Sequence, residues 1–308
     1  MMRLCYLILA HNNLEYVAEL IESLSDDNIG FIVHVDAKCQ ESMTSLERLI
    51  KEKDISLIRP REDIRWGDKS MIDVVNRMSL AALNDNRKYD YFILLSGQDM
   101  PVKSPEYIRH YIETGGLKNY MAASPMLTDD CLWLEQGRRR LQCYAVRLGS
   151  RDIATIEPLC MNWGNLRQIA KTFISGNVKA VYDLFRVFFS KKRKGFNMPP
   201  YGGEFWWRMN RESLDKILHY YYDDLELIQE VSFTSNPDEI VYNTLAYNLC
   251  DNIERSTLTY INWQGKKSPE YIVMEDKHLI KSLISKENIL FCRKVKDKEL
   301  LKYVRQFF

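Results

Sequence analysis

Two neighbouring carboxylates follow a proline in the segment Asn236–Glu239, directly before the apolar run Ile240–Leu245. Asparagine is a good helix N-cap and proline fits the first turn, so a helix is predicted to begin here. The amides and dipole of a helix N-terminus favour negative charge, which would keep Asp238 and Glu239 ionised and fixed. Such a carboxylate could remove a proton from a hydroxyl group as a general base. A plain acidic helix start is the alternative interpretation.

The composition is that of an ordinary globular protein. A chain of 308 residues with 46% hydrophobic and 28% charged residues is long enough for one large α/β domain or two small ones. Its net charge of +1 provides no general attraction to nucleic acid, so no nucleic-acid partner is expected.

Cysteine usage and hydropathy bear on the compartment. The seven cysteines are scattered singly and form no CxxC pair, which is typical of reduced thiols in a cytosol. No signal peptide and no run of eighteen apolar residues is present. We therefore expect a cytoplasmic protein that is, at most, peripheral on the inner face of a membrane.

Apolar runs alternate with helical patterns through the first 110 residues. Strands are predicted over 3–10, 30–36, 55–58 and 89–96, and helices over 14–24, 42–53 and 70–83. This alternation predicts βαβ units and a parallel sheet flanked by helices. We expect a single domain over 1–308, with a nucleotide-binding half at 1–115 and an acceptor-binding and catalytic half at 116–308.

Polar residues follow the predicted strands, at the strand ends where parallel sheets bind ligands. The candidates are His11 with Asn12, Asp36, and Gln98 with Asp99. Asp36 could contact a nucleoside or, alternatively, cap the next helix. No GxGxxG follows the first strand and no GxxxxGK[ST] occurs, which disfavours dinucleotide enzymes and P-loop NTPases.

The second half carries an aromatic segment and three basic segments. In Tyr201–Asn210, paired glycines would let the backbone approach a ligand, and the aromatics would form a strand that faces sugar rings or a core. Over 184–194 an apolar helix face ends in four cations, which suggests contact with an anionic membrane or a solvated helix end. The late cations of 264–269 and 293–294 suggest phosphate neutralisation or plain surface lysines.

Several segments occur in an order that resembles one family, the core-2/I-branching glycosyltransferases, which include β-1,6-N-acetylglucosaminyltransferases and peptide O-xylosyltransferases. The chain resembles the single-domain bacterial members. The segments are Leu7–His11, Phe31–Lys38, Trp66–Gly67 with Ser70, Leu94–Lys103, Gly203–Trp207, Asn236–Glu239 and Phe291–Lys294.

The resemblance implies a GT-A-type, Rossmann-like fold, an inverting reaction, a UDP-sugar donor and catalysis without a metal or other cofactor. The place where most GT-A enzymes carry Asp-x-Asp reads Ser96–Asp99, with one carboxylate. By resemblance Glu239 is the catalytic base. The donor-binding residues implied by it are His11, Asp36, Lys294, and Lys267 or Lys266 as a second phosphate-binding cation.

Acceptor-binding residues follow less closely from the resemblance, which is loose over 125–150. The candidates are Asp99, Glu135, Arg138, Glu204, Trp206 and Trp263. The expected acceptor is a glycan or a lipid-linked glycan.

The function expected from these features is transfer of a sugar from a UDP-sugar to a hydroxyl of a glycan acceptor during polysaccharide biosynthesis. The donor sugar expected is N-acetylglucosamine, with xylose as the alternative. A catalytically silent nucleotide-sugar or glycan-binding module on the same fold is the second hypothesis, because a fold alone does not fix function. A metal-dependent transferase that uses Asp99 is the third.

Overall fold

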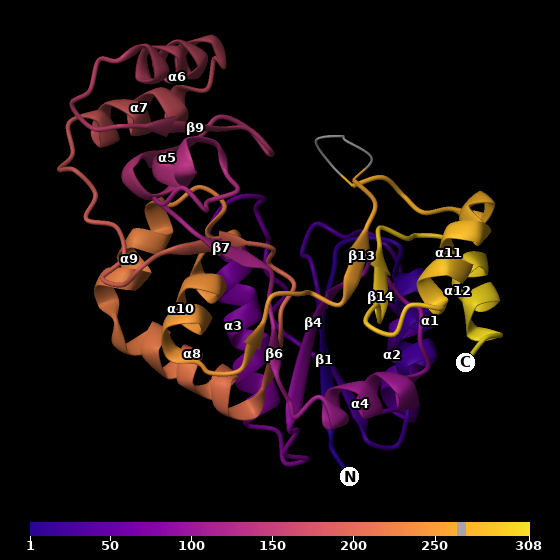
Figure 1. Ribbon diagram of the computed structural model, residues 1–308. Coiled ribbons are helices and arrows are strands. Elements are labelled where there is room, and N and C mark those ends of the chain that lie inside the picture. The colour runs from indigo at the N-terminus through magenta and orange to yellow at the C-terminus, as the bar shows by residue number, and fades with distance from the viewer. Residues whose placement is uncertain (264–268) are drawn as a thin grey trace.

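A seven-stranded sheet runs through the computed structural model, which describes residues 1–263 and 269–308 (Figure 1). Four neighbouring strands at one end of the sheet are parallel, and β11 is antiparallel to both of its neighbours. This mixed, mostly parallel arrangement confirms the predicted GT-A-type α/β fold. The strand order is β12 (Ile253–Glu254), β6 (Asn119–Tyr120), β11 (Arg208–Asn210), β4 (Tyr91–Ser96), β1 (Leu4–Ala10), β2 (Ile29–Val35) and β3 (Ile55–Leu57).

The central strands are buried on both faces, which explains their continuous apolar sequences. Every residue of β1, β2 and β4 is buried. Along β1 the side chains alternate between two cores: Tyr6 and Ile8 belong to one, and Leu7 and Leu9 to the other.

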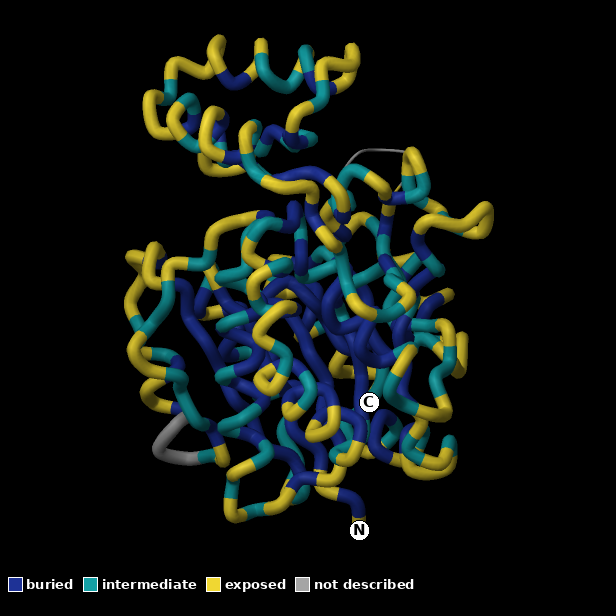
Figure 2. Tube along the Cα trace, turned by 90° about the vertical axis from the view of Figure 1, so that its left-hand side faces the viewer, coloured by how far each residue is buried: buried dark blue, intermediate teal, exposed yellow. Residues whose placement is uncertain are grey.

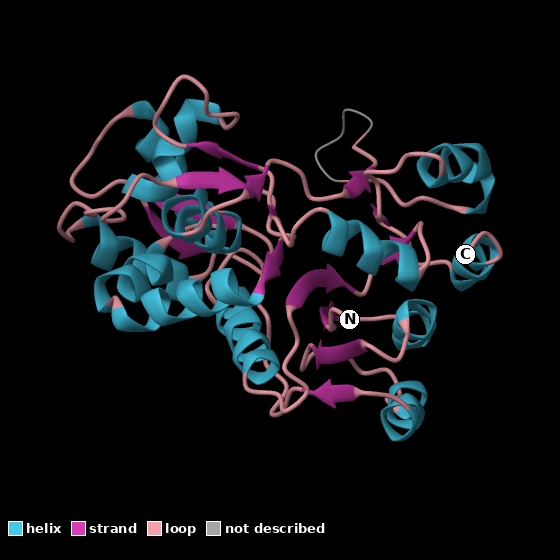
Figure 3. Ribbon diagram, turned by 60° about the horizontal axis from the view of Figure 1, so that its bottom comes forward, coloured by secondary structure: helices cyan, strands magenta, loops and turns pink. Residues whose placement is uncertain are grey.

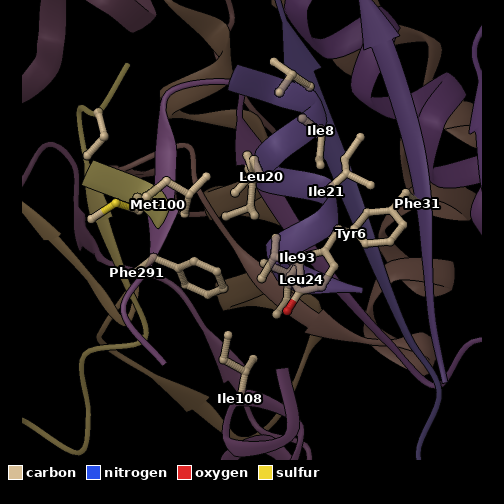
Figure 4. Packing of buried hydrophobic residues seen from close by; sticks show 14 of the residues in the cluster. Tyr6, Ile8, Leu20, Ile21, Leu24, Phe31, Ile93, Met100, Ile108 and Phe291 are labelled. Atoms are coloured by element: carbon tan, nitrogen blue, oxygen red, sulfur yellow. The ribbon is translucent and has the colours of Figure 1, made fainter. Parts of the chain in front are cut away.

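Helices cover both faces of the sheet (Figure 3). In the core on one face, Tyr6 stacks on Phe31 at 5.6 Å between ring centroids and meets Phe291 edge-on at 6.4 Å (Figure 4). The helices on this face are α1 (Leu14–Leu24), α2 (Thr44–Glu52), α4 (Pro105–Thr114), α11 (Lys277–Ile284) and α12 (Lys298–Arg305). Those on the other face are α3 (Ser70–Leu83), α8 (Arg211–Asp223), α9 (Leu225–Phe233) and α10 (Val241–Leu249).

A second, three-stranded sheet brings the end of the chain back to the first half. Its order is β13 (Thr259–Ile261), β14 (Phe291–Arg293) and β5 (Asp99–Pro101), and Arg293 is paired with Asp99 across it. The elements β14, α11 and α12 therefore pack on strands and helices of 1–115, so the two predicted halves are interleaved in space.

The remaining elements lie above the carboxyl ends of the parallel strands. Figures 1 and 2 both show the pair α6–α7 standing away from the main body. These elements are β7 (Ala123–Pro125), a 3-10 turn at Leu134–Gly137, α5 (Arg138–Gln142), β8 (Tyr144–Arg147), β9 (Ile153–Ile156), α6 (Trp163–Ile174), α7 (Val178–Phe188) and β10 (Tyr201–Gly203).

The aromatic strand predicted within Tyr201–Asn210 is wrong. The segment contains two short strands, β10 and β11, which lie in different sheets. Its paired glycines serve internal packing: a Cβ on Gly203 would lie 2.0 Å from the Ala122 carbonyl oxygen, and one on Gly202 would lie 2.4 Å from the Trp133 ring. The groups that approach these two glycines closely thus belong to other parts of the same chain.

All seven cysteines lie within the described residues and carry free thiols. Over the described residues, no helix is both long enough and apolar enough to cross a bilayer. The cytoplasmic location stays a prediction.

Candidate functional site

His11 and Asp36 are brought together at the ends of β1 and β2. The Asp36 amide donates to the Ala10 carbonyl at 2.8 Å, so the two strand ends share a hydrogen bond. Partial burial lowers the pKa of the His11 imidazole. The negative charge of Asp36 acts in the opposite direction and raises this pKa. The positive charges of Arg151 and Lys294 lower it further.

Asp36 is a buried turn residue. Its carboxylate accepts a hydrogen bond from the Lys38 amide at 2.8 Å and forms an ion pair with the Lys38 ammonium at 3.3 Å. The alternative role as a cap of the next helix is wrong, because α2 begins at Thr44 and has Met43 at its N-cap. The turn holds the carboxylate at the strand end, beside His11.

Lys294 follows β14 and lies among other cations. Burial lowers the pKa of its ammonium group, and the nearby charges of Arg293 and Arg151 lower it further, while Asp99 opposes them. A lysine in such surroundings is stabilised by an added anion. The position therefore suits a negatively charged ligand.

Arg151 is the residue that sequence reasoning missed at this end of the site. It lies in the turn of the β8–β9 hairpin, close enough to His11 and Lys294 for its charge to lower the pKa of both. Arg147 fixes the hairpin through its hydrogen bond to the Trp66 carbonyl at 2.9 Å and its ion pair with Asp68 at 3.1 Å.

Gly67 explains why the Trp66–Gly67 segment can hold this hairpin. Its φ is +74°, and a Cβ there would lie 2.6 Å from Cδ1 of Ile153 on β9. Its carbonyl accepts from the Asn236 amide at 3.0 Å. One loop thus connects the hairpin that carries Arg151 to the segment that carries Glu239.

Asn236–Glu239 does not begin a helix in the predicted way. Asn236 is left-handed, with φ of 52°, and its side chain caps nothing. Pro237–Glu239 form a 3-10 turn, and α10 begins only at Val241. Helix amides therefore do not hold these carboxylates.

Glu239 is held instead by an arginine. Arg140 donates from Nη1 to Oε2 of Glu239, and both side chains are about one third exposed. The Arg140 guanidinium lies 3.9 Å above the Trp133 ring, and that ring packs against Gly202. Among the described residues, nothing donates a hydrogen bond to Oε1 of Glu239, which leaves this oxygen free to accept a proton.

Asp238 is a second carboxylate beside Glu239, with a different environment. Its Oδ1 is buried and lacks a hydrogen-bond partner among the described residues. Burial raises the pKa of Asp238 to about 7, and the negative charge of Glu239 contributes. The expectation that both carboxylates of this segment stay fully ionised near neutral pH is therefore wrong for Asp238.

Asp99, predicted as an acceptor residue, is buried and has partners within the chain. It is 1% exposed, and its Oδ2 accepts from the Ser96 hydroxyl at 2.7 Å. Its Oδ1 pairs with Arg293 at 3.7 Å. Both oxygens are thus engaged, one at the end of β4 and the other by β14, because a buried carboxylate needs such partners.

Glu204 and Trp206 lie together over Arg293. The Arg293 guanidinium is 4.1 Å above the Trp206 ring, and the Thr257 hydroxyl donates to Glu204 at 2.9 Å. Burial raises the pKa of the Glu204 carboxyl. Trp206 and Glu204 are half-buried, whereas Trp207 is in the core and stacks on Tyr242 at 5.3 Å.

The other predicted acceptor residues are exposed. Glu135 lies within the 3-10 turn Leu134–Gly137 and Arg138 begins α5, and the structure gives neither side chain a partner among the described residues. Trp263 is 47% exposed at the end of β13. Lys266 and Lys267 lie outside the described residues.

The sequence carries a basic stretch that contains Arg140 and Arg151, but no local signal assigns either residue to the site. Arg140 is 99 residues from Glu239 in the chain. The sequence shows four arginines within 138–147. Two of them have structural roles: Arg139 donates a hydrogen bond to the Thr155 carbonyl of β9, and Arg147 donates one to the Trp66 carbonyl. Spacing alone does not distinguish them.

The fold and the site define a class of protein: a GT-A-type α/β protein with cations at the parallel strand ends and an arginine-held carboxylate in a turn joined to the same Trp66–Gly67 loop. Residues 4–138 match the family described as Core-2/I-Branching enzyme. This confirms the resemblance predicted from the motifs, and these residues form a core-2/I-branching segment.

A xylosyltransferase of Ciona intestinalis is 25% identical over 172 residues, which are 53% of this chain and 20% of the relative. The chain thus spans about a fifth of the length of that curated relative.

Two solved structures are similar at low sequence identity. S. aureus TarS 1-349 is 12% identical, with 93% of this chain and 65% of that chain covered and a TM-score of 0.40. The 4-diphosphocytidyl-2C-methyl-D-erythritol synthase of Anaerococcus prevotii is 9% identical, with 99% and 96% covered and a TM-score of 0.38. At these TM-scores neither similarity bears on function.

Proposed function

We propose that the protein is an inverting glycosyltransferase that moves a sugar from a UDP-sugar to a hydroxyl of a glycan or lipid-linked glycan. The carrying observation is the grouping of Lys294, Arg151 and His11 at the ends of the parallel strands, of which β1 lies within the segment that matches the core-2/I-branching family. Such a group suits the diphosphate of a nucleotide-sugar.

In the proposed reaction the acceptor hydroxyl oxygen attacks the anomeric carbon from the side opposite UDP. Its proton passes to Oε1 of Glu239, while Arg140 holds Oε2 and so fixes the carboxylate. The bond between the anomeric carbon and the β-phosphate oxygen breaks, and UDP leaves with the electron pair. The configuration at the anomeric carbon is inverted.

The leaving group gains negative charge as that bond breaks, so the site must stabilise it more strongly in the transition state than in the ground state. In the proposal, Lys294 and Arg151 supply the positive charge that stabilises the leaving UDP. Arg151 takes the role expected of Lys266 or Lys267, which lie outside the described residues. Asp99 is committed to Ser96 and Arg293, which argues against a metal held by this residue.

Asp36 is proposed to contact the nucleoside. The acceptor is proposed to contact Glu204, Trp206 and Trp263. The donor sugar proposed is N-acetylglucosamine, with xylose as the alternative. A relative described as a xylosyltransferase keeps xylose in consideration but matches over only part of its length.

The test is release of UDP from UDP-N-acetylglucosamine, UDP-xylose and other UDP-sugars, with and without a glycan acceptor. We expect acceptor-dependent release from one donor, unchanged by EDTA or by added manganese. Lys294→Ala and Arg151→Ala should each lower turnover about 10²-fold, the scale for loss of one preorganised charge. Arg48→Ala, a change of an exposed arginine on α2, should have no effect.

Each result has a defined consequence. Activity that EDTA abolishes and manganese restores would mean that a metal supplies the charge, and the metal-independent mechanism would be abandoned. UDP binding by calorimetry without turnover of any donor would favour the second candidate, a silent nucleotide-sugar-binding module. No binding of UDP at all would overturn both.

A further inference from the structure

Helix α7 is apolar on two opposite sides. One side packs against the β8–β9 hairpin through Ala180, Leu184 and Val187. The other side, at positions i, i+4, i+7 and i+11, faces solvent: Val178 is 83% exposed, Tyr182 66%, Phe185 53% and Phe189 69%. A helix of a globular protein normally exposes a polar face there.

Helix α6 continues this exposed surface. Phe173 meets Phe185 edge-on, with 6.2 Å between the ring centroids, so the two helices share one apolar surface. Ile174, next to Phe173, is 85% exposed. We call Phe173, Ile174, Val178, Tyr182, Phe185 and Phe189 the α6–α7 apolar surface. It lies on the helix pair that projects from the body (Figure 2).

Positive charge is concentrated in the same part of the chain. Residues 158–195 contain eight Lys and Arg and a single acid, a net charge of +7 in a chain whose total is +1. Several of these cations are neutralised locally, as in the pairs Lys171–Asp152 and Lys179–Asp183. Within 158–195, all of which the structure describes, the exposed Lys and Arg side chains without an acidic partner are Arg167, Arg186, Lys191 and Lys192.

The structure corrects the membrane contact predicted over 184–194. Leu184 and Val187 face the hairpin, and Arg193 is buried with its guanidinium paired to Glu230 at 2.9 Å. Lys194 pairs with Glu226. The exposed apolar residues come instead from both helices, 173–189, with Lys191 and Lys192 at their edge.

We propose that the α6–α7 apolar surface docks on an anionic lipid bilayer, with its rings at the headgroup boundary and its unpaired cations on the lipid phosphates. Amphipathic helices lie in this way in membrane interfaces, and clustered Lys and Arg draw them to anionic lipids. A second copy of this surface fits poorly as the occupant, because each copy would bring the same four unpaired cations. The inference does not depend on the proposed reaction.

The experiment is co-sedimentation of the full chain with vesicles of pure phosphatidylcholine and with vesicles of equal parts phosphatidylcholine and phosphatidylglycerol. We expect binding to the anionic vesicles only, weakened by salt. The double variant Lys191→Gln, Lys192→Gln should bind about tenfold more weakly or worse, the scale for loss of two cations near an anionic surface. The triple variant Tyr182→Ser, Phe185→Ser, Phe189→Ser should lose binding.

The matched control is Leu225→Ser, which removes a side chain that is 77% exposed on α9, outside this surface. It should bind vesicles as the wild type does. Circular dichroism checks that each variant is folded, and the charge variant, at exposed positions, keeps the test valid if the triple variant unfolds. Equal sedimentation with both lipids, or none with either, would overturn the proposal. A dimer by light scattering that the triple variant dissociates, without vesicle binding, would reassign the surface to self-association.

Discussion

At the scale of single residues, the proposed proton transfer depends on Glu239, whose Oε2 is held by Arg140. Glu239→Gln keeps the size of the side chain and its hydrogen bond but removes the base. We expect turnover to fall roughly 10²–10⁴-fold, the usual contribution of a general base. UDP affinity by calorimetry should change little, because Glu239 contacts the acceptor in the proposal.

The matched control for this change is Glu226→Gln, in which an exposed glutamate paired with Lys194 loses its charge. Its turnover should equal that of the wild type. A Glu239→Gln enzyme that retained turnover within a few-fold of wild type would remove Glu239 from the role of base.

Asp238 should make stability depend on pH. Its pKa is about 7 in the folded protein and near 3.8 when unfolded, so between these values the folded state binds more protons. Stability from this group is therefore highest below about pH 4 and falls as the pH rises to about 7. Asp238→Asn should remove this dependence and stabilise the protein at about pH 8 by about 2–4 kcal/mol.

Urea unfolding of the two proteins at several pH values measures this difference. The wild type and the variant should converge at acid pH and separate with increasing pH. If the difference in free energy of unfolding between the two proteins did not vary with pH, the Asp238 carboxyl would not titrate in this range.

At the scale of elements, Gly202 of β10 determines where Arg140 lies. The Trp133 ring packs on Gly202, and the Arg140 guanidinium lies over the same ring, 3.9 Å from its centroid. Gly202→Val should push Trp133 away and so displace Arg140 and Glu239. We expect turnover to fall about tenfold to a hundredfold, as when a catalytic group is misplaced, with UDP affinity unchanged.

A double-mutant cycle tests this connection. Trp133→Ala should lower turnover to a similar extent, and adding Gly202→Val to it should cost little more, because both changes act through one contact. Fully additive losses would mean that Gly202 acts on the site through another route.

At the scale of the whole molecule, the C-terminal helix α12 packs on α1 and so joins the end of the chain to its beginning. Leu300, Leu301 and Val304 are buried in the same core as Tyr6 and Leu20. Lys298 pairs with Glu15 at 2.9 Å across the same contact. This packing holds β14 against the first half of the chain, and Lys294 directly follows β14.

Leu301→Ala should therefore destabilise the entire fold, by about 2–5 kcal/mol, as for other buried leucines. The exposed neighbour provides the control, since Lys302→Ala should change stability by less than about 0.5 kcal/mol. Urea unfolding should be followed by tryptophan fluorescence and by circular dichroism. The tryptophans lie at 66–263, outside α12, so a shift of both signals together is expected of a single domain. A shift in circular dichroism alone would indicate separate domains.

The sequence by itself determined the elements and the polar residues that follow them. The apolar runs of β1, β2 and β4 are local and continuous because these strands are buried on both faces, so their positions and the parallel sheet could be predicted. Because parallel strands end at one edge, the neighbourhood of His11 and Asp36 followed as well. The motifs predicted the family, which the match over 4–138 confirmed.

Only the tertiary structure decided what those side chains contact. Arg140 and Glu239 meet across 99 residues, Arg151 reaches the strand ends through a hairpin held by the Trp66 loop, and Arg193 turns inward to Glu230. No local pattern distinguishes these arginines from their neighbours. Each is assigned by burial and by the acid or aromatic ring that long-range packing places beside it, and the energy of a charged group depends on those surroundings.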